Sequence, residues 1–308
     1  MTGHTPQTLE TVLRTSIPEW KELPLSTKHV SGGMTNENFC VQAGDQAFFV
    51  RLSDRNSKRL GIDRNDEYAA AYEAAKIGVG PQVHAYFPVQ RILITHYIAG
   101  RSLISQDFHS TQRLDQFIDL LYRVHQSKLS IKPFSVFAVV GNYWNIIQNH
   151  PANLPENIGD ILSLASVIED YIPDEPTTLC HNDLLAANFL ADHQTHRLWL
   201  VDWEYAGRGS LYFDLGNFCA NQELPVTLER YLVERYFSYR NIEYHLACVR
   251  LMRIMSDIRE AFWGLVQHCL SPLSVDFLAY AELHLKRVEK AIEASELEMN
   301  LKVIAQGR

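Results

Sequence analysis

The stretch that decides the fold runs from residue 179 to residue 190 and reads Leu-Cys-His-Asn-Asp-Leu-Leu-Ala-Ala-Asn-Phe-Leu. Within it, Asp183 stands five residues before Asn188, and His181 stands two residues before Asp183. A further carboxylate, Asp202, follows fourteen residues after Asn188, at the end of a short apolar run. This order of residues predicts a polar loop, followed by a short strand that ends at the carboxylate of Asp202.

This set of side chains has the composition that phosphoryl transfer needs. One carboxylate accepts or orients the proton of the attacking hydroxyl, while a second carboxylate and an amide oxygen hold Mg²⁺ against the phosphates of ATP. The spacing matches the kinase pattern His-x-Asp-x4-Asn with a later Asp. Asp and Asn also cap turns when they occur singly. The ordered set, rather than any one member, predicts Asp183 as the catalytic base, with Asn188 and Asp202 as metal ligands.

A second signal is a glycine-rich turn at residues 31–36, between two predicted strands. Adjacent glycines let the backbone approach a phosphate, and exposed N–H groups can form an anion nest. Gly-Gly alone also makes ordinary hairpin turns. The next strand, however, carries Arg51 near its end, which can fork onto phosphate oxygens. Glu67 on the following predicted helix can pair with Arg51, as Lys and Glu do in protein kinases.

Two later motifs complete the chemistry. In the run Phe-Asp-Leu-Gly-Asn at 213–217, Asp214 is predicted to steady the catalytic loop, and a helix N-cap is the alternative. Trp263 lies within a late predicted helix, near carboxylates. An aromatic face in such a setting holds quaternary ammonium groups, although a helical Trp is more commonly a core residue.

The pattern along the chain predicts an α+β fold with two lobes. Strand-like runs cover 28–52, and an Ala-rich helix over 64–77 ends at Gly78-Val79-Gly80-Pro81, because Pro cannot continue a helix. Two short apolar segments follow. Later segments have helical periodicity: 110–126, 158–171, 226–237, 243–269 and 274–294. We expect a small β-rich N-lobe, residues 1–97, that binds nucleotide phosphates. A larger α-rich C-lobe, residues 98–308, should carry the catalytic and substrate-binding residues.

Composition narrows the class of protein. The 308 residues carry a net charge of −8 and no run of Lys and Arg, which disfavours nucleic acid as a partner. Five cysteines form no Cys-x-x-Cys pair, so reduced thiols are expected rather than a disulfide framework or a zinc site. The first twenty residues lack the apolar core of a secretion signal. No apolar run approaches the ~20 residues that cross a bilayer. We therefore expect a cytoplasmic protein with no membrane span.

Together these motifs resemble the choline/ethanolamine kinase family, within the aminoglycoside-phosphotransferase-like group of kinases. The matching segments span residues 30 to about 270. They are Ser-Gly-Gly-Met-Thr-Asn at 31–36, Val-Arg-Leu at 50–52, Glu67 with Gly80-Pro81, His-Asn-Asp at 181–183 with Asn188, Val-Asp-Trp-Glu-Tyr at 201–205, Phe-Asp-Leu-Gly-Asn at 213–217 and Phe-Trp-Gly-Leu at 262–265. The resemblance implies a protein-kinase-like fold and the use of ATP and Mg²⁺.

The resemblance also implies a role for individual positions. ATP phosphates would lie under the glycine-rich turn, with Arg51 and Glu67 behind them, and adenine would meet the backbone near His96 and Ile98. The cofactor-binding set is thus Ser31, Gly32, Gly33, Met34, Thr35, Asn36, Arg51, Glu67, His96 and Ile98. The substrate side comprises Asp183, Glu204, Tyr205 and Trp263. Val266 stands where choline kinases often carry a second Trp, and Asn221 stands about where eukaryotic members carry a Glu.

The expected reaction is phosphorylation of a small amino alcohol, choline first or ethanolamine, with phosphocholine and ADP as products. One alternative is a kinase for another small alcohol, such as thiamine or an aminoglycoside. A second is a catalytically inactive binding module of the same fold, which the presence of all three predicted catalytic residues disfavours. The sequence leaves the oligomeric state open, a dimer included.

Overall fold

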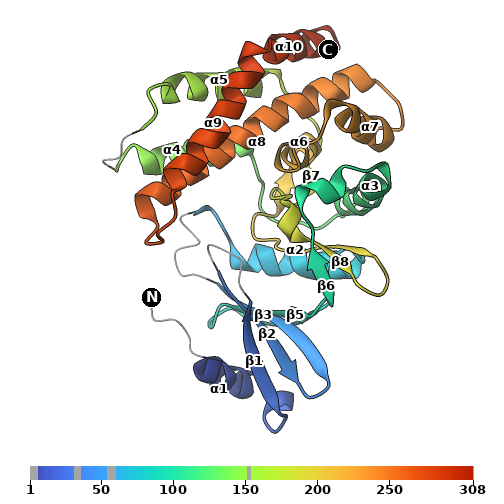
Figure 1. Cartoon of the computed structure of the whole chain (residues 1–308), viewed down its shortest axis with the longest axis vertical. Helices are drawn as coiled ribbons and strands as arrows, with labels where there is room; N and C mark the ends of the chain where they lie inside the picture. The colour runs from blue at the N-terminus through green and yellow to red at the C-terminus, as the bar shows by residue number, and fades with distance from the viewer. Residues whose placement is uncertain (1–5, 31–35, 54–59, 151–153, 308) are drawn as a thin grey trace. The chain divides into compact units, whose positions relative to one another are not determined.

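The computed structural model describes residues 6–30, 36–53, 60–150 and 154–307. The contacts divide the chain into two compact units (Figure 1). The first comprises Met1–Ser102 and Phe189–Tyr205, and the second comprises Leu103–Asn188 and Ala206–Arg308. The predicted division at residues 97/98 differs from this grouping at residues 98–102 and 189–205.

The first unit is built on a five-stranded antiparallel sheet with the strand order β1-β2-β3-β5-β4. Its strands are β1 (Leu25–Val30), β2 (Asn36–Ala43), β3 (Gln46–Ser53), β4 (Val83–Phe87) and β5 (Ile92–His96). Strands β2 and β3 form a hairpin around Gly44, whose φ of +58° is one that glycine adopts readily. The buried side chains of this sheet pack with α1 (Pro6–Ser16) and Trp20, through Leu9, Leu13, Ile17, Phe39, Val41, Phe48, Val50, Ile92 and Ile94.

The helix of the first unit, α2 (Arg64–Lys76), confirms the predicted helix at 64–77. The Asp63 carboxylate caps it by accepting the backbone N–H groups of Asn65 and Asp66. It ends where Gly78 takes a φ of +71°. Because the apolar face is made of small alanines, α2 packs closely and holds Glu67 in a buried position.

A second, three-stranded sheet explains why residues 189–205 group with the first unit. Strand β8 (Phe189–Asp192) pairs with β6 (Gly100–Ser102) and with β9 (Leu198–Leu200). The Leu200 N–H donates to the Val79 carbonyl at 2.8 Å, and the Arg197 guanidinium donates to the Gly78 carbonyl. The segment that follows β9 is therefore fixed beside the end of α2, and it carries Asp202 and Glu204.

The second unit is mainly helical and is organised around α8 (Ile242–Leu270), which contains 29 residues. Helix α8 contacts most of the other helices, namely α4 (Val136–Ile147), α5 (Ile158–Tyr171), α6 (Leu211–Asn221), α7 (Val226–Tyr236), α9 (Phe277–Glu293) and α10 (Glu296–Gly307) (Figure 1). Helix α3 (Thr111–His125) packs on α7, and strands β7 (Thr178–Cys180) and β10 (Gly207–Gly209) form a small ladder.

The predicted helical segments correspond to α3, α5, α7, α8 and α9, whereas α4, α6 and α10 of the second unit were not predicted. Helices α6 and α8 approach closely because Gly216 has no side chain. A Cβ at this position would lie 2.6 Å from the Arg253 backbone nitrogen. Among the described residues, no helix has both the length and the apolar character needed to span a bilayer.

Candidate active site

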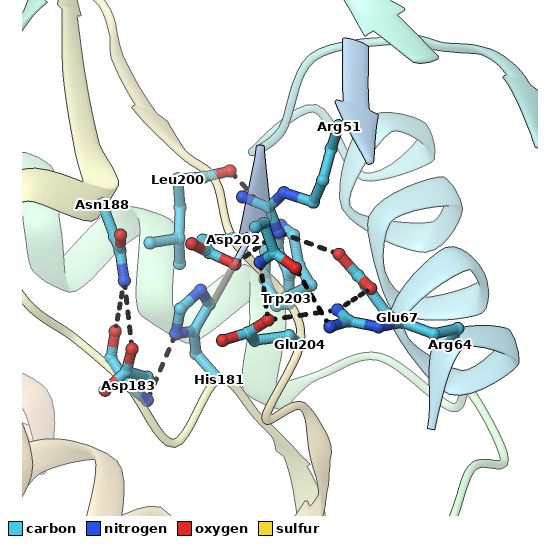
Figure 2. A network of polar contacts seen from close by, with 11 residues as sticks. Arg51, Arg64, Glu67, His181, Asp183, Asn188, Leu200, Asp202, Trp203 and Glu204 are labelled. Carbon is cyan, nitrogen blue, oxygen red and sulfur yellow. Dashed lines mark hydrogen bonds and ion pairs between the residues drawn. The ribbon is translucent and has the colours of Figure 1, made fainter. Parts of the chain in front are cut away.

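The first group of predicted site residues forms a buried ion network within the first unit (Figure 2). Arg51, on β3, donates to Glu67 Oε1 at 2.8 Å and to Asp202 Oδ1 at 2.5 Å. Burial by itself lowers the pKa of the Arg51 guanidinium. The nearby carboxylates of Asp202, Glu67 and Glu204 have the larger effect, so the pKa of Arg51 is raised. The predicted Arg51–Glu67 pair is therefore present, and Asp202 is attached to the same guanidinium.

A second arginine, which sequence reasoning missed, completes this network. Arg64 donates to Glu67 Oε2 at 2.6 Å, to Glu204 Oε2 at 3.1 Å and to Asn36 Oδ1 at 3.1 Å. Asn36 in turn donates to Glu204 at 3.0 Å. The spacing of Arg64 and Glu67, three residues apart on a predicted helix, was the available signal.

Two arginines here face three carboxylates, so the network favours an added positive charge. Burial, and then repulsion from Asp202, raise the pKa of the Glu204 carboxyl. Asp202 has the most exposed carboxylate, at 27% against 3% for Glu67 and 8% for Glu204. It also has a φ of +71°, a left-handed conformation that few residues other than glycine adopt. A carboxylate that is exposed and held by one oxygen suits Mg²⁺, which prefers oxygen ligands.

The second group is the predicted catalytic loop, which lies in the second unit between β7 and the short helix η4 (Ala186–Asn188). The Asn188 Nδ2 donates to the Asp183 carbonyl at 2.9 Å and, more weakly, to Asp183 Oδ2 at 3.4 Å (Figure 2). The Asp183 N–H donates to His181 Nδ1 at 3.3 Å. These bonds fix Asp183 and Asn188 relative to each other and leave the amide oxygen of Asn188 as a ligand atom.

Asp214 anchors this loop from α6, as predicted. Its carboxylate is fully buried and accepts the backbone N–H groups of His181 at 2.9 Å and Asn182 at 2.7 Å. His125 Nε2 lies 3.1 Å from the same carboxylate. Asn217, one turn along α6, accepts the Leu184 N–H at 2.7 Å. The alternative role for Asp214 is wrong, because Ser210 occupies the N-cap of α6.

Trp263 lies on α8 with only 7% of its surface exposed. Its ring meets the rings of Phe277 and Tyr280 nearly edge to face, at centroid distances of 5.9 and 5.7 Å. The Tyr280 hydroxyl donates to Glu260 Oε2 at 2.6 Å. Val266 is fully buried. An aromatic group with an adjacent carboxylate is thus built where α8 and α9 pack together.

The remaining predicted residues fall into three sets. Ser31, Gly32, Gly33, Met34 and Thr35 lie outside the described residues. His96, at the end of β5, packs its ring against Phe48, and the Ile98 carbonyl accepts the Gly100 N–H at 2.9 Å. Tyr205 is buried at the end of the segment that carries Asp202.

The comparisons with known proteins agree with this geometry. The family model for choline/ethanolamine kinase matches residues 27–227, more than half of the chain. Protein LicA of Haemophilus influenzae is 26% identical over 273 residues, covering 86% of this chain and 78% of its own length. Ethanolamine kinase 2 of Mus musculus is 26% identical over 323 residues, covering 94% and 82%.

Solved structures show the same fold. A choline/ethanolamine kinase family protein from Mesorhizobium loti superposes with a TM-score of 0.83, 24% identity and coverage of 97% of this chain and 99% of its own. LicA in complex with AMP gives a TM-score of 0.78, 20% identity and coverage of 95% and 99%. The predicted protein-kinase-like fold, with a small sheet-rich part and a larger helical part, is confirmed.

A protein-kinase-like fold together with the match to the choline/ethanolamine kinase family model defines a small-molecule kinase. The chain belongs to the choline/ethanolamine kinase family. Its reaction class is therefore transfer of a phosphoryl group from a nucleotide to an alcohol, and its substrate is a small molecule.

Proposed function

We propose that this chain transfers the γ-phosphoryl group of ATP to the hydroxyl of choline, or of ethanolamine, with Asp183 as the base. The observation that carries the proposal is the tethered catalytic loop, in which Asn188 and Asp214 fix the backbone on both sides of the Asp183 carboxylate. A base held in this way needs little reorganisation when the substrate hydroxyl approaches.

In the proposed reaction, the substrate hydroxyl gives its proton to the Asp183 carboxylate. The hydroxyl oxygen forms a bond to the γ-phosphorus, while the bond from that phosphorus to the bridging oxygen of ADP breaks. The products are the phosphorylated alcohol and ADP. Proton acceptance by a positioned carboxylate contributes roughly 10²–10⁴-fold to such a rate.

Mg²⁺ would be held by the Asn188 amide oxygen and the Asp202 carboxylate. The donor set fits, because both are oxygen ligands and the Asn188 amide nitrogen is already engaged by the Asp183 carbonyl. The bound ion would neutralise charge that develops on the phosphate oxygens. Asp202 is oriented by Arg51, so its free oxygen has a fixed position.

We assign nucleotide binding to the N-terminal part of the chain, residues 1–97, and catalysis and substrate binding to residues 98–308. Residues 31–36, Arg51 and Glu67 would contact the phosphates, and backbone groups near His96 and Ile98 would contact adenine. The surplus carboxylate charge beside Arg51 suits a metal-bound nucleotide better than a free one. We place the reaction in the cytoplasm, because the five cysteines are free thiols, which a reducing compartment maintains.

On the substrate side, the proposal assigns the ammonium group to Trp263, with Glu204 and Tyr205 as further contacts. The rings of Phe277 and Tyr280 beside Trp263 support an aromatic site for a cation. Val266 supplies no second ring at this site, which leaves ethanolamine as the alternative substrate. A kinase for thiamine or an aminoglycoside, and an inactive module of the same fold, are the remaining alternatives.

The test is consumption of ATP in the presence of Mg²⁺ and a panel of choline, ethanolamine, thiamine and an aminoglycoside. The proposal expects turnover with choline or ethanolamine, and far less with the other two. Turnover with thiamine or the aminoglycoside alone would replace the substrate assignment. Absence of turnover with every compound, in a folded protein that binds ATP, would favour the inactive module.

A further inference from the structure

We propose that Arg259, on α8, is the positioning residue of the catalytic base and supplies a guanidinium that the segment between Asp183 and Asn188 lacks. This inference rests on the proposed function, since it concerns how Asp183 is aimed. Nothing in the sequence pattern singled out Arg259, because it lies 76 positions after Asp183.

The segment between the base and Asn188 carries no cationic side chain. The four residues between Asp183 and Asn188 are Leu184, Leu185, Ala186 and Ala187. None of these side chains can donate a hydrogen bond to a carboxylate. Any guanidinium or ammonium group that orients Asp183 must therefore come from another element.

Arg259 provides that group. Its guanidinium donates through one nitrogen to the Asn182 carbonyl at 2.7 Å and through another to Asp183 Oδ1 at 3.3 Å. The residue is 2% exposed, and the planar guanidinium presents its donors in a fixed fork. One side chain thus contacts both the backbone before the base and the carboxylate itself.

Arg259 also forms an ion pair with its neighbour Glu260, through the guanidinium nitrogen that donates to the Asn182 carbonyl. The Glu260 Oε1 lies 3.3 Å from the Arg259 guanidinium, and Glu260 Oε2 accepts the Tyr280 hydroxyl at 2.6 Å. A buried cation is tolerated only with such compensation, so the guanidinium has little freedom to move. A chain of contacts therefore runs from Tyr280 on α9, through Glu260 and Arg259, to the base.

The consequence for the reaction is a defined orientation of the Asp183 carboxylate. Arg259 contacts Oδ1 at 3.3 Å and the Asn188 amide contacts Oδ2 at 3.4 Å, so a different side chain holds each oxygen. Without Arg259, Oδ1 loses this contact, and the carboxylate can rotate away from the orientation that the substrate hydroxyl needs.

The experiment compares four variants by steady-state kinetics and thermal melting: Arg259→Met, Arg259→Lys, Asp183→Asn and the Arg259→Met/Asp183→Asn double variant. Arg259→Met should lower kcat by roughly 10²-fold, the effect of misplacing a reacting group by about 1 Å, with the KM for ATP close to wild type. Arg259→Lys should recover part of that loss. In the Asp183→Asn background, Arg259→Met should not lower kcat further, because the carboxylate that Arg259 positions is absent.

Arg253→Met is the matched control, since Arg253 lies on the same helix and its guanidinium pairs at 2.8 Å with Glu229 of α7. It should lower the melting temperature without changing kcat. An unchanged kcat in Arg259→Met, or a loss that multiplies with that of Asp183→Asn, would overturn the inference while leaving Asp183 as the base. Near-normal turnover of Asp183→Asn alone would overturn the proposed function, and with it the role of Arg259.

Discussion

Arg51 and Asp202 are 151 positions apart in the chain, yet the Arg51 guanidinium donates to the Asp202 carboxylate at 2.5 Å. The contact joins β3 to the segment after β9, and the same guanidinium also binds Glu67 on α2. A single buried cation thus fixes the position of the proposed metal ligand relative to the sheet. Loss of that cation should affect stability as well as catalysis.

Replacing Arg51 by Met should therefore destabilise the fold. The change leaves Glu67 buried and without this partner, and removing one member of a buried pair costs about 3–5 kcal/mol. Urea unfolding measures the free energy directly. Arg230→Met is the control, because Arg230 pairs with Glu243 on the surface, where such pairs contribute about 0–1 kcal/mol. An equal loss of unfolding free energy in Arg51→Met and Arg230→Met would contradict the structural role of Arg51.

Gly216→Ala should also destabilise the second unit. The added methyl group would lie 2.6 Å from the backbone of α8, so α6 and α8 must separate, and such overpacking costs about 1–3 kcal/mol. Gly141→Ala is the matched control, because a Cβ there meets nothing within 4 Å. It lies inside α4, where Ala is favoured over Gly by roughly 0.5–1 kcal/mol. We expect Gly216→Ala to lower the melting temperature and Gly141→Ala to raise it. An unchanged melting temperature in Gly216→Ala would contradict the close approach of α6 to α8.

Much of this arrangement could be read from the sequence because the signals are local. The spacing of Asp183 and Asn188, the Ala-rich helix and the Phe-Asp-Leu-Gly-Asn run each lie within one short segment. Helix α4 was missed because most residues of Val136–Ile147 are apolar, so the positions that the fold buries, namely Val136, Val140, Tyr143 and Ile147, do not stand out from their neighbours in the sequence. Arg259, and the contacts of Arg64 with Glu204 and Asn36, were missed because tertiary packing brings these partners together, and no spacing in the sequence encodes it. The grouping of residues 189–205 with the first unit depends on strand pairing for the same reason.

Removal of the metal, or of its proposed ligand, should stop turnover. Asp202→Ala should abolish Mg²⁺-dependent ATP turnover, because no neighbouring side chain of the same segment can supply an equivalent exposed carboxylate. Wild-type enzyme should stop in excess chelator and recover when Mg²⁺ is restored. Asp192→Ala is the control and should keep wild-type turnover, because this half-buried carboxylate at the end of β8 accepts the Gln194 and Thr195 N–H groups of the next turn and is not a predicted ligand. Activity that persists without a divalent metal would contradict the proposed mechanism.

Trp263→Phe tests the proposed ammonium site. The Phe ring attracts a cation less strongly than the Trp ring, so this variant should raise the KM for choline. Complete loss of the cation–π attraction, worth about 0.5–2 kcal/mol, would raise that KM roughly 2- to 30-fold. The KM for ATP should hardly change. Because Trp263 packs against Phe277 and Tyr280, Trp263→Ala should also cost about 3–5 kcal/mol of stability. Trp144→Phe, on α4, is the control. A fall in melting temperature with no selective change in the choline KM would make Trp263 a core residue only.

The most direct measurement is the phosphorus NMR spectrum of a reaction containing ATP, Mg²⁺ and choline or ethanolamine, run with wild type and with Asp183→Asn. Wild type should convert ATP to ADP and an equal amount of the phosphorylated alcohol. Asp183→Asn should melt near the wild-type temperature, bind ATP, and form product roughly 10²–10⁴-fold more slowly. Appearance of inorganic phosphate without a phosphorylated alcohol, or wild-type product formation by Asp183→Asn, would contradict the assignment of this chain as an amino-alcohol kinase that uses Asp183 as its base.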